Sequence, residues 1–166
     1  MLVLFLIALI VLPLWYWRGR SHRLAGETRV DLCRRLDSLP GLAGLQSAPF
    51  AAGDVAGSCR WSAGPQRVVL EASLITTRGS GGHDVGRQFD AWREEIKASY
   101  GPTANLRQIG DENLRTLSWR SPGGNDRFVE DHGIALSLHS PSLDDVQLDA
   151  LIDPAREALR RDPQGR

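Results

Sequence analysis

The sequence predicts an α+β fold, in which an antiparallel sheet is covered by amphipathic helices and preceded by one N-terminal transmembrane helix. The first observation behind this prediction is an uncharged, apolar stretch over residues 1–17. The second is that most strand-like stretches after residue 59 follow one another through short turns, and strands joined in that way pair antiparallel. The third is a set of three stretches whose apolar residues recur at helical spacing and therefore need a sheet to cover.

Residues 1–17 carry the strongest signal in the sequence. As a helix they would be about 25 Å long, which is at the short end for the hydrocarbon core of a bilayer. Aromatic rings and arginines gather at the end of this stretch, where they favour the headgroup layer and can extend the span by snorkelling. The predicted membrane-interface residues are Trp15, Tyr16, Trp17, Arg18 and Arg20. We therefore expect residues 1–17 to lie in the lipid of a bacterial inner membrane.

The residues that follow argue against removal of this stretch. A signal-peptidase site needs small side chains, whereas the aromatic residues at positions 15–17 are bulky. Residues 24–26 resemble the start of a lipid-attachment motif, but Glu27 stands where the cysteine should be. We therefore expect an uncleaved, single-pass signal-anchor, followed by a basic juxtamembrane linker over residues 18–27.

Two observations oppose each other on the side of the membrane that the domain faces. Arg18, Arg20 and Arg23 follow the span, and the positive-inside rule then places the domain in the cytoplasm. The two cysteines, Cys33 and Cys59, would instead suit an oxidising compartment, where they could form a disulfide. In a cytoplasmic domain they would pack as buried free thiols. Their spacing matches no zinc motif.

Residues 28–161 are predicted to form one domain, with a flexible tail over residues 162–166. This length suits a single domain with its own core. Of the 20 basic residues, 17 lie beyond Arg23 together with all 20 acidic ones, so the chain beyond Arg23 has a net charge of −3. A mildly acidic domain without a basic stripe argues against a nucleic-acid partner. The use of arginine almost to the exclusion of lysine is typical of a GC-rich bacterial genome.

The first predicted helix spans residues 28–39, with Thr28 as its cap and Asp31 in its first turn. A long loop follows over residues 41–58, because this stretch is rich in Gly, Ala, Pro and Ser and has no sustained period. The second helix begins after Asp84 and runs to about residue 99, with the clearest amphipathic pattern in the domain.

Alternation of apolar and polar residues predicts the strands, and glycine- and proline-rich turns separate them. The predicted strands are residues 59–61, 67–76, 106–109, 114–120, 127–130 and 133–139. The last helix opens at Ser142, with Asp145 in a capping arrangement. Asp153 and Pro154 are typical of the N-cap and the first position of a second helix, so this helix is expected to be kinked or divided there.

Several local features follow one order along the chain. A cysteine lies in the first helix (Cys33), a second lies in a Cys-x-Trp strand with Trp61, residues 109–112 step into a strand, and a hairpin at residues 127–139 precedes the closing helix. This arrangement resembles the PsbP-like α/β sandwich and small anchored extracytoplasmic two-cysteine proteins of unknown function. The lipid-attachment cysteine usual among the anchored relatives is absent here. The resemblance implies an exported, non-catalytic adaptor or binding domain, and favours an extracytoplasmic location over the cytoplasmic alternative.

No catalytic, cofactor-binding or metal-ligating residues are predicted. The glycines at residues 79–82 lack the P-loop and the nucleophile-elbow fingerprints, so we interpret them as a linker. His83, His132 and His139 follow no metal-ligand spacing, and His132 sits in a predicted turn. Adjacent carboxylates at residues 94–95 and 144–145 diverge on a helix, which makes them poor partners for acid–base catalysis.

Three tryptophans in the domain allow two interpretations. Trp61, Trp92 and Trp119 lie at strand or helix spacing, which favours core positions. An exposed ring among them would instead mark a partner surface. The leading functional hypothesis is a membrane-anchored, non-catalytic protein-binding module or accessory subunit of a bacterial envelope complex. The alternative is a small-ligand carrier or sensor with a cavity beneath the helix that contains Trp92.

Overall fold

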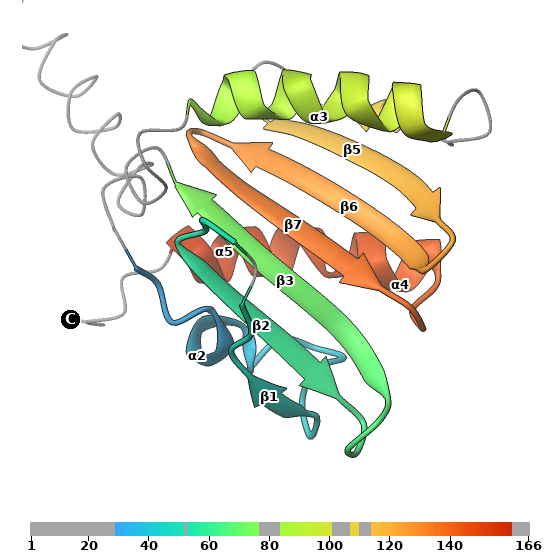
Figure 1. The fold of residues 1–166 in the computed structure, drawn as a ribbon. Helices are drawn as coiled ribbons and strands as arrows, with labels where there is room; N and C mark the ends of the chain where they lie inside the picture. Colours follow the sequence, from blue (N-terminus) through green and yellow to red (C-terminus); the bar gives the residue numbers. More distant parts are fainter. Residues whose placement is uncertain (1–28, 52, 77–83, 101–106, 110–113, 161–166) are drawn as a thin grey trace, which may run out of the picture.

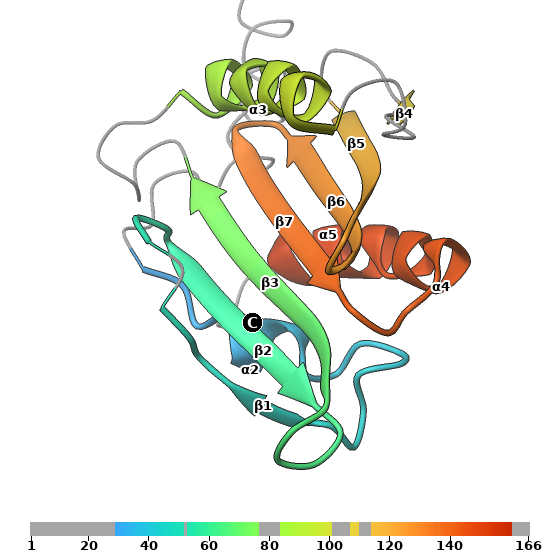
Figure 2. The ribbon, with the colours of Figure 1, turned by 45° about the vertical axis from the view of Figure 1, so that its right-hand side comes forward.

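The computed structural model describes residues 29–51, 53–76, 84–100, 107–109 and 114–160. Within them one sheet of seven strands has the order β1-β2-β3-β7-β6-β5-β4, and each neighbouring pair is antiparallel. The strands are β1 Gln46–Ala48, β2 Gly57–Ser62, β3 Val68–Thr76, β4 Arg107–Ile109, β5 Leu114–Ser121, β6 Gly124–Asp131 and β7 Ile134–Ser140. Figure 2 shows the two short edge strands, β1 and β4, at opposite ends of the sheet.

Helices cover both faces of this sheet (Figure 1). The helix α3 (Val85–Tyr100) lies on one face, while α2 (Leu32–Leu36), α4 (Asp145–Ala150) and α5 (Ile152–Arg160) lie on the other. Each face therefore has its own hydrophobic core, as a three-layer arrangement requires. The expected α+β fold with a helix-covered antiparallel sheet is confirmed for the described residues.

The larger core lies between β2, β3, β7 and the three helices of the second face. Trp61, Leu70, Leu74 and Leu136 are among its buried side chains. The smaller core lies beneath α3, where Phe89 and Trp92 pack on Phe128, with ring centroids 5.6 and 4.3 Å apart. The alternation predicted for β3 is thereby confirmed, because Leu70, Ala72 and Leu74 are all buried on one face.

Several element boundaries differ from the prediction, among them the end of α2 at Leu36 instead of residue 39 and the start of β2 at Gly57 instead of residue 59. The helix α2 begins only at Leu32, because Asp31 is its N-cap and accepts a hydrogen bond from Arg34 N at 3.1 Å; Thr28 lies outside the described residues. The expected loop contains the strand β1, which pairs with β2. The strand β6 begins at Gly124, three residues earlier than predicted, because the turn from β5 is tight and Ser121 pairs with Gly124.

A further difference concerns the last helical segment, which is divided as expected but at a different residue. Asp144, not Ser142, caps α4, in a capping box with Gln147. The chain breaks at Leu151, so Pro154 falls in the first turn of α5, where its missing N–H costs no helical hydrogen bond. The prediction of a cap at Asp153 is therefore wrong by two residues.

The predicted membrane anchor falls on residues 1–17 and lies outside the described residues, as do the linker at residues 18–27 and the tail. Among the residues that the structure describes, no helix is long and apolar enough to cross a membrane. The anchor therefore stays a prediction from the sequence.

Candidate functional site

A pocket of about 780 Å³ opens beside α2, at the end of the sheet where β2 begins. Two segments far apart in the sequence form its walls, residues 29–34 with Asp37 on one side and residues 49–51 and 53–58 on the other. Ligand pockets of proteins typically occupy about 300–1,000 Å³, so this pocket is large enough for a small molecule or a few residues of a peptide.

Backbone contacts hold the two walls together. Val30 N donates to Ala56 O at 2.7 Å, and Ala56 N donates to Leu74 O at 2.7 Å, so this stretch continues the sheet beyond β2. At Gly57 the Val30 carbonyl lies so close that a Cβ atom would collide with it. Glycine is therefore required at this position for the walls to approach each other.

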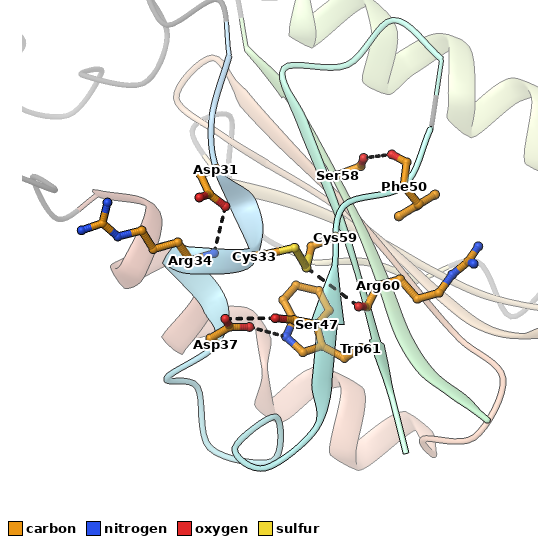
Figure 3. Close-up of a disulfide and its surroundings, with 10 residues drawn as sticks. All are labelled: Asp31, Cys33, Arg34, Asp37, Ser47, Phe50, Ser58, Cys59, Arg60 and Trp61. Carbon is orange, nitrogen blue, oxygen red and sulfur yellow. Dashed lines mark hydrogen bonds between the residues drawn. A yellow bond between two sulfur atoms is a disulfide. The ribbon is translucent and has the colours of Figure 1, made fainter. Parts of the chain in front are cut away.

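The wall formed by residues 49–51 and 53–58 is folded back over β2 by side-chain contacts. Ser58 Oγ donates a hydrogen bond to the Phe50 carbonyl, and the Arg60 guanidinium lies 5.1 Å from the centroid of the Phe50 ring (Figure 3). Gly53 adopts a positive φ of 72°, which lets the chain turn back toward β2. The long predicted loop is thus an ordered wall in its described part.

A disulfide between Cys33 and Cys59 joins the wall at residues 29–34 to the sheet, with the two Cα atoms 5.1 Å apart (Figure 3). Its prediction from the two cysteines is confirmed, and the free-thiol alternative is excluded. A second connection lies one helical turn further on, where Asp37 accepts hydrogen bonds from Trp61 Nε1 at 2.9 Å and from Ser47 Oγ at 3.0 Å. These contacts fix a helix of only five residues, which would be unstable alone.

Charges of both signs line the pocket. The cationic side chains are Arg29 and Arg34, and the anionic ones are Asp31, Asp37 and Asp54. A pocket with this lining suits a polar occupant that carries both donors and acceptors, such as a peptide segment, better than a purely apolar or a strongly charged one.

The tryptophans fall into two groups. Trp61 and Trp119 are buried, in the larger and the smaller core respectively, as the core interpretation expects. They therefore do not form the partner surface that was their alternative interpretation. Trp92 is half-buried, and its ring lies edge-on to Trp119 with the centroids 6.4 Å apart. The rings beneath α3 fill the place in which a carrier's cavity was expected.

His132 lies in the two-residue turn between β6 and β7, and its positive φ of 51° matches the type I′ turn that such hairpins favour. Its Nδ1 is 2.7 Å from Asp131, which also accepts hydrogen bonds from Arg156 and Arg160 of α5. Burial opposes ionisation of this carboxyl, but the bonds from His132, Arg160 and Arg156 outweigh it and lower the pKa of Asp131. The cluster ties α5 to the hairpin, which is a structural role.

Replacing Asp131 by asparagine should lower the free energy of unfolding at neutral pH by about 1–3 kcal/mol, because charge-assisted hydrogen bonds are lost. Because folding lowers the pKa of Asp131, these bonds stabilise the folded chain at any pH above the pKa that Asp131 has in the unfolded chain. They are lost as the pH falls through the lower pKa that Asp131 has in the folded chain. The difference between the two proteins should thus shrink below about pH 4. Urea unfolding at several pH values measures it. Asp153→Asn is the control, because Asp153 also binds Arg156 but is exposed; an equal loss in both variants would contradict the prediction.

The remaining histidine of the described residues, His139, has its Nδ1 2.8 Å from Asp126 on the neighbouring strand. The structure does not bring it near His132, and His83 lies outside the described residues. Within the part of the chain that the structure describes, no cluster of three or more His, Cys, Asp or Glu side chains has the geometry of a metal site.

The adjacent carboxylates at residues 144–145 have structural roles. Asp144 caps α4, and Asp145 binds the buried Arg127 at 2.8 Å. The Arg127 hydrogen bond lowers the pKa of Asp145 despite slight burial. The glycines at residues 79–82 lie outside the described residues.

The pocket itself is the candidate that sequence reasoning missed. Its walls come from a stretch interpreted as a loop and from the start of the first helix, and neither carries a catalytic or ligand-binding motif. The one usable signal was the cysteine pair, because a disulfide brings residues 29–34 beside residues 57–59.

No family model matches this chain, and no curated protein or solved structure matches it either.

Proposed function

We propose that this chain is a membrane-anchored, non-catalytic module that binds a segment of a partner protein in the pocket lined by residues 29–34, Asp37 and residues 49–51 and 53–58. The observation that carries the proposal is the pocket itself, with its volume and its charges of both signs. Val146 is the one large hydrophobic side chain that is exposed among the described residues. A partner would therefore bind through polar contacts in a concave site more readily than on an apolar surface patch.

We further propose that the module is an accessory subunit of an envelope complex and faces the extracytoplasmic side. The Cys33–Cys59 disulfide supports this side, because disulfides persist in oxidising compartments and are rare in the cytosol. The arginines after residue 17 oppose it under the positive-inside rule. We give the disulfide more weight, because it is formed in the structure. The resemblance of the sequence to PsbP-like sandwiches supports the same side.

The variant Ala51→Trp should abolish recovery of the partner, because Ala51 lines the pocket and an indole there fills space that the partner segment needs. Affinity purification of the full-length chain from detergent-solubilised membranes measures this. We expect the same protein partner with the wild type in repeated experiments and its loss with the variant.

The matched control is Ala91→Trp, which adds the same ring to an exposed position of α3 outside the pocket lining. It should recover the partner as well as the wild type does. Recovery that is equal with both variants would place the partner site elsewhere. Recovery of the chain alone in every case would contradict the proposal as a whole.

A second candidate function is a small-ligand carrier or sensor. The volume of the pocket also fits a small molecule, which is the observation in its favour. Native mass spectrometry of the purified chain distinguishes the two functions. A co-purified small molecule that Ala51→Trp displaces would favour the carrier, whereas a partner protein with an unliganded chain would favour the binding module.

A further inference from the structure

The disulfide lies at the wall of the pocket, and its two sulfur-bearing residues differ in their access to it. Cys33 is buried, with 9 % of the whole residue exposed, but it is among the residues that line the pocket, whereas Cys59 is completely buried and is not among them. A reagent that enters the pocket therefore reaches the Cys33 side of the disulfide first. This asymmetry has a chemical consequence, because thiol–disulfide exchange depends on which sulfur can be attacked.

We propose that the pocket admits a thiol to Cys33 and that the redox state of the Cys33–Cys59 disulfide controls the shape of the pocket. This assigns a modification site at Cys33 Sγ and a class of reactant, a thiol of small size or on an extended segment of a redox protein. The control of partner binding rests on the function proposed above, whereas the exchange chemistry does not.

The exchange proceeds in two balanced steps. A thiolate forms a bond to Cys33 Sγ while the bond between the two cysteines breaks, and the electron pair leaves on Cys59 Sγ, which takes a proton from water. A second thiolate then attacks the sulfur of the reagent in the mixed disulfide and releases the Cys33 thiol. Two thiols are oxidised to one disulfide, and the protein disulfide is reduced by two electrons.

Reduction removes the covalent connection between the wall at residues 29–34 and the sheet. The helix α2 has five residues, and a helix this short does not persist without tertiary contacts. After reduction, the buried Leu32 and Leu36, the hydrogen bonds to Asp37 and the bond from Val30 N to Ala56 O still hold this wall. Loss of the covalent link lets the backbone around Cys33 shift between these contacts, and this shift changes the geometry of the pocket.

Adduct mapping on the wild-type, full-length chain in detergent micelles tests the exchange directly. The protein is treated briefly with reduced glutathione, quenched with acid, alkylated with N-ethylmaleimide and digested for mass spectrometry. We expect glutathione on Cys33 and N-ethylmaleimide on Cys59 in the same molecules. Adducts on Cys59, or an even division between the two cysteines, would overturn the proposed route.

The rate of reduction by dithiothreitol tests the role of the pocket. We expect the rate to fall about tenfold in Ala51→Trp, because the disulfide must then become accessible by local opening, and to stay unchanged in Ala91→Trp. Equal rates in all three proteins would overturn entry through the pocket. Neither measurement needs a partner, so the exchange can fail while partner binding stands, and a loss of partner binding would leave the mapping result intact.

Discussion

Replacing Cys33 and Cys59 together by alanine should lower the free energy of unfolding by about 3.5 kcal/mol, which is the loop-closure estimate for their 26-residue separation. The physical reason is that the unfolded chain, once freed of the cross-link, gains conformations that the folded chain does not. Alanine is chosen because a small apolar side chain leaves no unpaired polar group next to the buried Cys59 position. Urea unfolding of the full-length protein in detergent, followed by tryptophan fluorescence, measures the change.

The wild type provides the control for this variant. After complete reduction, and kept in dithiothreitol so that both thiols stay free, it should lose a similar amount of stability, because the same cross-link is absent. A loss of less than about 1 kcal/mol in both samples would lie within the range of ordinary substitutions. It would show that α2 is held by its apolar and hydrogen-bonded contacts alone, and the account of the pocket wall would then be wrong.

Phe128→Ala should lower the free energy of unfolding by about 3–5 kcal/mol, the usual cost of truncating a buried aromatic ring. Phe128 is completely buried beneath α3, where it contacts the rings of both Phe89 and Trp92. The truncation leaves a cavity between the sheet and α3 that these two rings can fill only in part. Thermal or urea unfolding measures the loss.

Val146→Ala is the matched control, because it also truncates an apolar side chain, but one that is 77 % exposed on α4. Its effect should stay within about 0.5 kcal/mol. If Phe128→Ala were as mild as this control, the ring cluster beneath α3 would not be a packed core. The space beneath α3 would then again be a candidate for the cavity of a small-ligand carrier.

The elements with strong local signals could be predicted from the sequence. The alternation in β3, the apolar spacing in α3 and the turn between β6 and β7 each depend on residues that are close together in the chain. The disulfide was predictable as one of two alternatives, because the sequence contains a single pair of cysteines. The order of these elements, with hairpins between most strands, was enough for the fold class.

What the sequence could not predict depends on contacts between distant residues. The strand β1 has three residues and no alternation, and it exists because Ser47 and its neighbours pair with β2 and because Asp37 binds Ser47. The same holds for the pocket, whose walls meet through Val30 and Ala56, 26 positions apart along the chain. Local propensity carries no information on such a meeting, so the candidate site emerged only from the fold.

We propose that the pocket holds a segment of a partner protein in a chain that residues 1–17 anchor in the membrane. Photo-crosslinking in intact cells measures this, with a benzophenone amino acid at position 34, where it replaces the long, exposed side chain of an arginine in the pocket lining, and, as a control, at position 91 on α3. We expect one discrete crosslinked protein from position 34, none from position 91, and loss of the product when both cysteines are replaced by alanine. The same crosslinks from both positions, or none from position 34 in cells that contain the full-length chain in their membranes, would contradict the proposal.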